Sequence, residues 1–126
     1  MNISLGRSGF KLAAIASHYN SETASYETHE LRAELVLSRS EAKGFYAALE
    51  QMKSKLESEM GESFTWHNPE GKNMCRIWVR RNADLSNAAE RQNDYAWLID
   101  KLDRMHTVFA PRIKILQPLE GETEDS

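Results

Sequence analysis

The sequence contains a single cysteine, Cys75, among its 126 residues. One cysteine excludes a disulfide within the chain and is typical of a reducing compartment, so the sequence predicts a cytoplasmic protein. No apolar run approaches the roughly 20 residues that cross a bilayer. The start of the chain also lacks the basic and apolar regions of a secretion signal. We therefore expect no membrane partner.

The chain also lacks an excess of charge of either sign. Its 16 basic residues face 19 acidic ones, and four of these acids lie in positions 118–126, which hold no lysine or arginine. The rest of the chain therefore carries 16 basic against 15 acidic side chains. This balance excludes a generally basic nucleic-acid binder, and attraction to an anion would need a local patch.

Length and composition predict one folded domain. Hydrophobic residues make up 40% and charged residues 28% of the chain, which is an ordinary globular balance. We assign residues 1–117 to a single domain. The acidic segment 118–126 has too little apolar surface to offset the entropy of ordering, and we expect it to be a disordered tail.

Residues 31–37 are the stretch around which the rest is organised. Apolar and other side chains alternate there, with a period of two that is typical of a strand with one apolar face. The apolar positions are Leu31, Ala33, Leu35 and Leu37, and the intervening ones are Arg32, Glu34 and Val36. A similar alternation over 10–16 predicts a preceding strand, and the polar stretch 18–28 predicts a long, mobile hairpin connection between the two.

Two segments have the spacing of amphipathic helices. The first is expected to open at a capping box, with Ser38 at the N-cap and Glu41 at N3, and to end at Gly61. The second is expected to begin at Asn87 and to end or bend sharply at Pro111, before a short apolar segment at 113–116. Apolar side chains recur every three or four residues in both. The stripes are Ala42, Phe45, Leu49, Met52, Leu56 and Met60, and then Tyr95, Leu98, Leu102, Met105 and Phe109.

Between these helices, residues 63–81 predict a β-hairpin whose turn is Asn68-Pro69-Glu70-Gly71. The order is therefore strand–strand–helix–strand–strand–helix. It predicts an α+β fold of two layers, with an antiparallel sheet of about four strands and both helices on one face. The expected core includes Leu35, Phe45, Leu49, Ile77, Leu98 and Leu102.

Several short motifs resemble one known family. They are Arg7-Ser8-Gly9-Phe10, Arg32-Ala33-Glu34-Leu35, Trp66, Pro69-x-Gly71 with Arg76-Ile77, and the stretch from Val108 to Lys114. Together they resemble an uncharacterised bacterial and phage domain family of unknown function, which often lies C-terminal to a restriction-endonuclease-like nuclease domain. The resemblance spans Arg7 to Leu116 and implies neither an activity nor catalytic residues.

The sequence departs from the family's pattern in three ways. It begins just before the domain, so we expect a standalone domain without the nuclease half. The connection 18–28 is longer than the pattern implies. His67 and Asn68 follow Trp66 where acidic residues are expected.

One face of the expected sheet is the candidate binding site. Arg76, Trp78 and Arg80 lie on one side of their strand, and Arg32 and Glu34 face the same way on theirs, with His67 beside them. Arginine and an aromatic ring on a sheet can hold phosphates and stack bases. Alternatively, Trp78 fills a second small core under residues 18–28, and the arginines pair with Glu34 and solvent. The sequence leaves both interpretations open.

Residue patterns elsewhere do not indicate catalysis, a cofactor or a metal. Glu41 and Lys43 have the Glu-x-Lys spacing of nuclease sites, but the first turn of a helix favours an acid in any case. Cys75 is interpreted as a core residue. The four histidines lack metal-ligand spacing: they are His18, His29, His67 and His106. We therefore expect no catalytic, cofactor-binding or metal-binding residues.

Together these observations predict a non-catalytic binding module. It would engage nucleic acid, a partner protein or a second copy of itself through an exposed sheet face, on which Trp78 and the arginines are open to solvent. The face carries Arg32, Glu34, His67, Arg76, Trp78 and Arg80. By analogy alone, the resemblance implies a place in restriction, phage defence or its counter-measures. The alternative is a nuclease-associated enzyme whose active site needs a partner chain or a homodimer.

Overall fold

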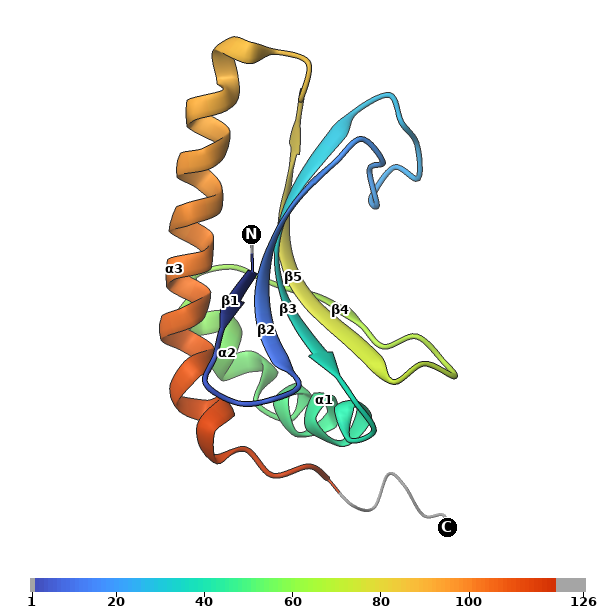
Figure 1. Cartoon of the computed structure of the whole chain (residues 1–126), viewed down its shortest axis with the longest axis vertical. Coiled ribbons are helices and arrows are strands. Elements are labelled where there is room, and N and C mark those ends of the chain that lie inside the picture. Colours follow the sequence, from blue (N-terminus) through green and yellow to red (C-terminus); the bar gives the residue numbers. More distant parts are fainter. Residues whose placement is uncertain (1, 120–126) are drawn as a thin grey trace.

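An antiparallel sheet of five strands carries all its helices on one face, as the computed structural model of residues 2–119 shows (Figure 1). The strand order is β1-β2-β3-β5-β4. The strands are β1 (Asn2–Ser4), β2 (Phe10–Ser17), β3 (His29–Ser38), β4 (Thr65–His67) and β5 (Met74–Ala83). The helices are α1 (Ala42–Glu50), α2 (Lys53–Met60), the short 3-10 helix η1 (Ala88–Glu90) and α3 (Arg91–Ile115). The predicted α+β class is confirmed.

The middle strand is β3, as the alternation in residues 31–37 predicts. Leu35 lies between Leu12 of β2 and Ile77 of β5, and all three side chains are completely buried. Their shared face is the one that the helices cover, because strand neighbours in register point their side chains to the same side. The hydrophobic period therefore gives the correct orientation of the central strands.

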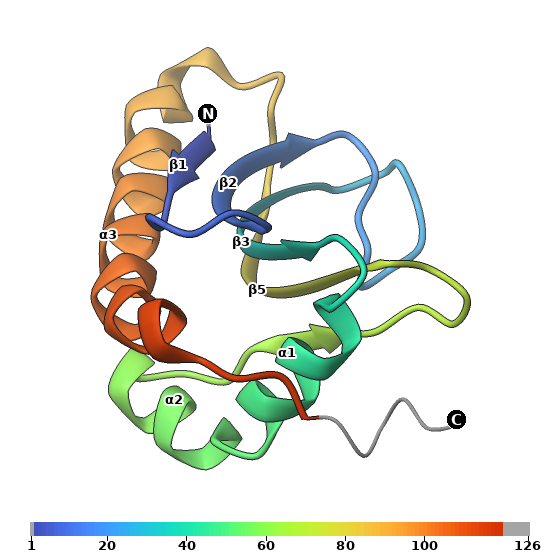
Figure 2. The ribbon, with the colours of Figure 1, turned by 60° about the horizontal axis from the view of Figure 1, so that its bottom comes forward.

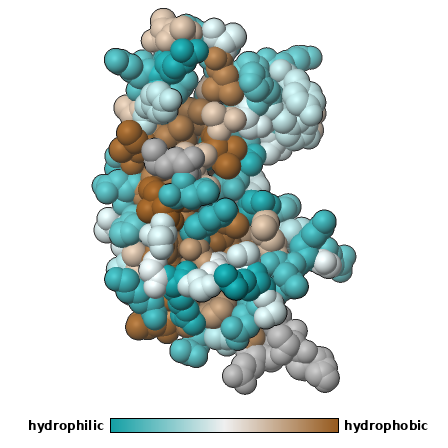
Figure 3. Space-filling view, viewed as in Figure 1, coloured by the Kyte–Doolittle hydropathy of each residue, from teal (hydrophilic) through white to brown (hydrophobic). Residues whose placement is uncertain are grey.

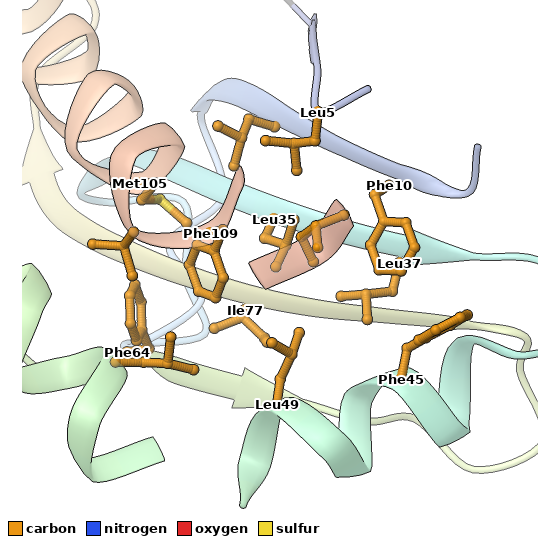
Figure 4. Close-up of a cluster of buried hydrophobic side chains, with 14 of the residues drawn as sticks. Leu5, Phe10, Leu35, Leu37, Phe45, Leu49, Phe64, Ile77, Met105 and Phe109 are labelled. Atoms are coloured by element: carbon orange, nitrogen blue, oxygen red, sulfur yellow. The ribbon is translucent and has the colours of Figure 1, made fainter. Parts of the chain in front are cut away.

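Both helical segments pack on this face, with α3 along one side and α1 and α2 across its lower end (Figure 2). Phe109 and Met105 of α3 meet Phe64, Leu35 and Ile77 in the interior, and Leu49 and Phe45 close it from α1 (Figure 4). All six core residues predicted from the sequence are buried. Within residues 2–119, no helix is both long enough and apolar enough to cross a bilayer.

The expected capping box at Ser38 is wrong. Ser38 is the last residue of β3, Arg39 has a positive φ of 78°, and α1 begins only at Ala42 after an N-cap, Glu41, whose side chain makes no capping hydrogen bond. Ser38 belongs to the sheet because the backbone N–H of Ser38 donates to the carbonyl of Gly9 at 2.9 Å. A ladder hydrogen bond thus replaces the local cap.

The expected first helix is divided, and the second continues further than expected. A break at Gln51 and Met52 separates α1 from α2. It lets Leu49 and Leu56 both reach the core, where each is completely buried. Helix α3 passes through Pro111 to Ile115. Its last turn includes the fully buried Ile113, so tertiary packing outweighs the local cost of the proline.

Two further differences concern short segments. Strand β1 was not predicted, because three residues show no periodicity; it pairs with Lys11, Leu12 and Ala13 of β2. Tyr95, expected in the buried stripe of α3, is 60% exposed. The expected short return segment at 113–116 is mostly the end of α3.

The chain after α3 crosses back over α1. Leu119 N–H donates to the carbonyl of Gly44 at 3.0 Å, and a Cβ placed on Gly44 would lie 2.8 Å from Cβ of Pro118. This close approach accounts for a glycine inside a helix. Pro118 and Leu119 thus contact the domain, whereas the rest of the predicted tail, 120–126, lies outside the described residues.

Candidate functional site

The sheet face turned away from the helices, here called the outer face, carries all six candidate residues. They stand in register across β2, β3, β5 and β4. The rows are Lys11–Val36–Arg76–His67, Ala13–Glu34–Trp78–Thr65, Ile15–Arg32–Arg80 and Ser17–Glu30–Asn82. The structure therefore brings Arg32, Glu34, His67, Arg76, Trp78 and Arg80 together, but it gives them two different environments.

At the upper end of the outer face, Glu30 is the centre of an ion-pair network. Its Oε1 accepts hydrogen bonds from Nε of Arg80 at 2.5 Å and from Oγ of Ser21 at 2.8 Å. Its Oε2 accepts from Nη1 of Arg32 at 2.7 Å. Glu30 is completely buried. A buried carboxylate is stable only when charged or polar donors surround it, and Glu30 has three such partners.

Glu34 extends this network down the strand. Nε of Arg32 donates to Glu34 Oε2 at 2.7 Å, and Nε of Arg76 lies 3.4 Å from Oε1. Arg80 also reaches Glu22 in the loop, with 3.1 Å between Nη1 and Oε1. Three arginines and three glutamates therefore balance one another. At this end of the face the arginines form ion pairs within the domain. This agrees with the alternative interpretation, in which they pair with Glu34 and have a structural role.

Residues 18–28 fold over the same end of the face. Asn20 is completely buried, and its Oδ1 accepts hydrogen bonds from the N–H of Glu22 at 3.0 Å and of Thr23 at 3.1 Å, which forms an Asx turn. Its Nδ2 donates to Oδ1 of Asn82 at 2.8 Å. The loop is thus tied to β5. The sequence analysis missed Glu30 and Asn20; only Glu30, two residues from Arg32 and in phase with it, had a detectable signal.

The ionisation of Glu30 follows from these contacts. Burial by itself raises the pKa of this carboxyl, but hydrogen bonds from Arg80, Ser21 and Arg32 and the positive charge of Arg32 outweigh it. The pKa of Glu30 therefore lies below its ordinary value of 4.5. Glu30 is therefore a carboxylate at neutral pH and supplies a negative charge beside both arginines.

Trp78 is not the exposed ring that the sequence analysis expected. It is 8% exposed, because the guanidinium of Arg32 lies over its ring with Cζ 5.0 Å from the centroid, and the ring of His67 lies 5.7 Å away. Its buried Nε1 has no hydrogen-bond partner among the described residues. The expectation of an exposed tryptophan is therefore wrong, and a base could stack on it only after Arg32 moved.

The lower end of the outer face is different, because cations there line open hollows. One hollow of about 520 Å³ is lined by His67, Lys72 and Arg76 together with Pro69, Asn73 and Met74. Another, of about 580 Å³, includes Lys11, Arg39 and Arg7. Among residues 2–119, no acidic side chain lines either hollow. The row that runs from Lys11 through the buried Val36 to Arg76 and His67 joins the two.

We call Lys11, Arg39, His67, Lys72 and Arg76 the basic end. Within the described part of the chain, Lys11, Arg39 and Lys72 take part in no ion pair, and Arg76 keeps a side chain that is 37% exposed. Arg7, by contrast, is occupied by the carbonyls of Ile113 and Leu116. The sequence analysis included His67 and Arg76 but missed Lys11, Arg39 and Lys72. Of these three, only Lys11 could have been found from the sequence, because it is in phase with the other outward-facing positions of β2.

The sequence analysis considered Lys43 and Cys75 as catalytic residues and rejected that interpretation. In the structure both side chains have structural surroundings. Lys43 Nζ donates to Oδ1 of Asn68 and to the carbonyl of Pro69, so it fastens the β4–β5 turn to α1. Cys75 is completely buried, and burial raises the pKa of its thiol, although Lys43 acts in the opposite direction. A buried, protonated thiol is a poor nucleophile. Among residues 2–119, no three His, Cys, Asp or Glu side chains gather as a metal site would require.

The histidines are also dispersed in the structure. His18 and His29 make one aromatic pair, with ring centroids 4.6 Å apart, and Nδ1 of His29 accepts a hydrogen bond from the N–H of Leu85 at 2.9 Å. His67 lies at the other end of the outer face and His106 lies on α3.

Comparison with family models matches residues 1–113 to the family described as Domain of unknown function (DUF4268). The chain belongs to this family. The predicted membership of an uncharacterised domain family is thereby confirmed. Neither the comparison with curated proteins nor that with solved structures finds a match. Because the description of DUF4268 names no activity, a function for this DUF4268 domain has to be argued from its surface.

Proposed function

We propose that this DUF4268 domain is a non-catalytic module that binds nucleic acid through the basic end of its outer face. The observation that supports this proposal most is the pair of hollows that the described part of the chain lines with cations and with no acid. The row from Lys11 to Arg76 joins them. Such a surface attracts phosphates even though the chain as a whole is slightly acidic, because electrostatic attraction at short range depends on local charge.

The dimensions of the basic end suit a nucleic-acid strand. It extends across the sheet from Lys11 on β2 to His67 on β4, three strand spacings away. At about 4.8 Å for each spacing, this is roughly 14 Å. One strand of a duplex carries a phosphate about every 3.4 Å along the axis, so the basic end could meet about four of them.

The buried position of Trp78 limits what the module reads. With Arg32 over its ring, Trp78 offers no free surface for a base. The remaining contacts come from charged side chains, which bind the backbone and carry no sequence information directly. We therefore expect binding that depends strongly on salt and weakly on sequence. A role in restriction or phage defence stays a prediction by analogy.

Salt-dependent binding tests this proposal. Fluorescence anisotropy would measure the affinity of single- and double-stranded oligonucleotides at several salt concentrations, for the wild type and for Lys11→Gln, Lys72→Gln and Arg76→Gln. Each substitution removes one cation, so each should weaken binding. Each should also reduce the slope of log K against log salt by about 0.9 for a duplex and about 0.7 for a single strand.

Lys55→Gln is the matched control, because Lys55 is an exposed lysine on α2, in the helix layer. It changes the net charge by the same amount but lies outside the basic end, and it should leave affinity and slope unchanged. Equal effects of all four substitutions would mean that only net charge matters, and the proposed site would be wrong. Cleavage of the oligonucleotide would favour the enzyme alternative.

A further inference from the structure

A polar hollow lies between α1 and the β4–β5 turn, apart from the basic end, whose residues do not line it. It has a volume of about 530 Å³ and includes Lys43, Tyr46, Ala47 and Glu50 of α1 together with Asn68 and Glu70 of the turn. The helical residues share one face of α1, because positions three, four and seven apart lie on the same side of a helix. The turn opposite them projects from the body of the molecule as a mostly hydrophilic lobe (Figure 3).

Lys43 holds the turn against α1 and supplies a positive charge at that wall of the hollow. Its Nζ donates to Oδ1 of Asn68 and to the carbonyl of Pro69, and Asn68 Oδ1 also accepts from Sγ of Cys75 at 3.4 Å. Both acceptors of Lys43 are uncharged, and Lys43 takes part in no ion pair among residues 2–119. Because an ammonium group has three N–H bonds, one donor and the positive charge of Lys43 are left for a ligand.

The hydroxyl of Tyr46 is a second free donor in the hollow. Only 4% of Tyr46 is exposed, and its ring meets the ring of Trp66 edge-on, with 5.8 Å between the centroids. Its hydroxyl makes no hydrogen bond with any described residue, and burial, followed by the negative charge of Glu50, raises the pKa of Tyr46 to about 12. The hydroxyl is therefore protonated at neutral pH. Because a largely buried donor without an acceptor costs free energy, this hydroxyl marks a place for an acceptor on a ligand.

Two carboxylates on different walls of the same hollow also lack partners. Glu50 is the last residue of α1, Glu70 lies in the turn, and both are exposed. Neither takes part in an ion pair within the described part of the chain. Glu70 follows Pro69, which Lys43 contacts, and Glu50 is seven residues from Lys43, or about 10 Å along the helix. A negative group therefore lies near each end of the hollow.

We propose that this hollow binds a basic α-amino acid, a small molecule with two cationic nitrogens and one carboxylate. The hollow offers two carboxylates and one ammonium group, so a ligand with the opposite set of charges complements it. One nitrogen of the ligand pairs with Glu50 and the other with Glu70, while its carboxylate accepts from the hydroxyl of Tyr46 and from Lys43. The volume of about 530 Å³ suits a small ligand. The proposal does not depend on nucleic-acid binding.

Other occupants fit the hollow less well. Among residues 2–119, no three His, Cys, Asp or Glu side chains gather as a metal site would require, and the charge of Lys43 would repel a cation that has no anionic group of its own. A phosphate or an acidic ligand would meet the carboxylates of Glu50 and Glu70. A simple diamine could pair with both glutamates, but it would leave the donors of Tyr46 and Lys43 without an acceptor.

A titration with lysine and its analogues tests the site. The probes are L-lysine, L-arginine, cadaverine, which is lysine without its carboxylate, and L-norleucine, which is lysine without its side-chain ammonium. Two-dimensional NMR spectra of the isotope-labelled full chain would follow the amides around the hollow. L-lysine or L-arginine is expected to bind with a Kd below about 1 mM. Cadaverine and norleucine should each bind about tenfold more weakly, because each lacks one charged group.

Variants of the hollow assign each contact. Tyr46→Phe should weaken binding of the better amino acid about tenfold and leave cadaverine unchanged, because only the amino acid has a carboxylate for the hydroxyl. Glu50→Gln and Glu70→Gln should weaken both ligands. Glu27→Gln is the matched control, since Glu27 is exposed in the loop at the other end of the sheet and changes the net charge by the same amount.

Three results would overturn the proposal. The first is that neither L-lysine nor L-arginine binds below about 1 mM. The second is that cadaverine binds as tightly as the amino acid, or that Tyr46→Phe weakens both equally, because the carboxylate would then make no contact with Tyr46. The third is an equal loss with Glu27→Gln, which would show that only net charge matters. Because no oligonucleotide is present, each result leaves the test of nucleic-acid binding unaffected.

Discussion

The guanidinium of Arg32 lies over the indole ring of Trp78, 5.0 Å from its centroid. The same arginine donates to Glu30 and Glu34, each at 2.7 Å. One side chain therefore covers the aromatic ring and joins the two buried carboxylates of the outer face. Because of this arrangement, Trp78 belongs to the folded interior, and the open part of the face begins at Arg76.

The unpaired indole N–H of Trp78 leads to a prediction about stability. Nε1 of Trp78 is buried without a partner among the described residues, whereas Nε1 of Trp66 donates to Oε2 of Glu57 at 3.1 Å. Trp78→Phe removes a buried donor that has no partner, so no hydrogen bond is lost, and we expect it to lower the free energy of unfolding by less than about 1 kcal/mol. Trp66→Phe removes a hydrogen bond to a charged group and should cost about 1.5–3 kcal/mol. Urea denaturation of both variants would measure the difference, and a larger loss for Trp78→Phe would contradict it.

The buried carboxylate of Glu30 makes stability depend on pH. Its pKa is below 4.5 in the folded state, so the carboxylate stabilises the fold above about pH 4.5, and this contribution is lost as the pH falls through the folded pKa. At neutral pH, Glu30→Gln leaves Arg32 and Arg80 without this counter-charge and should cost about 2–3 kcal/mol.

The difference in free energy of unfolding between the wild type and Glu30→Gln should therefore become smaller as the solution is acidified. Urea denaturation at a series of pH values would measure it. Glu59→Gln is a suitable control. Hydrogen bonding to Arg112 lowers the pKa of Glu59 in the same direction, but Glu59 is exposed and screened, so its effect should be much smaller. A constant difference across the acidic range would show that Glu30 does not titrate with folding.

Gly44 and the segment that follows α3 should be energetically coupled. Gly→Ala inside a helix ordinarily stabilises it by about 1 kcal/mol. In the full chain we expect Gly44→Ala to destabilise or to gain nothing, because its Cβ would lie 2.8 Å from Pro118. In a chain ending at Gln117, the same substitution should raise the free energy of unfolding by the ordinary amount of about 1 kcal/mol. Thermal unfolding of the four chains forms a double-mutant cycle, and equal effects of Gly44→Ala in both lengths would mean that the segment does not rest on α1.

Arg7 fastens the end of α3 to the first loop of the chain. Its Nη1 donates to the carbonyls of Ile113 at 2.9 Å and Leu116 at 2.7 Å, and its guanidinium lies 4.8 Å from the ring centroid of Phe45. A lysine ammonium could donate to both carbonyls, but it lacks the planar guanidinium that lies over the ring of Phe45. We expect Arg7→Lys to lower the free energy of unfolding by about 1–2 kcal/mol. Urea denaturation would measure it, and an unchanged midpoint would show that Arg7 is not needed to hold the helix end.

Local patterns in the sequence determined the architecture. The alternation in β3 placed Leu35 inward and Arg32 and Glu34 outward, and the three-four spacing of α3 identified Leu98 and Leu102 as buried. These features can be predicted because a side chain's direction depends on its own element's period and on nothing distant. The same phases brought the six candidate residues to one face. Local patterns were also sufficient to recognise the family.

Tertiary structure alone decided which parts of that face are open. Arg80 pairs with Glu22 and Glu30, and the loop containing Asn20 covers the upper end, through contacts between residues as many as 60 positions apart in the chain. Similarly, Pro111 stays inside α3 because Ile113 beyond it is buried in the core. Such outcomes depend on free energies of packing and ion pairing between distant segments. No local period encodes them, and in this protein they outweigh local preferences such as the cap at Ser38.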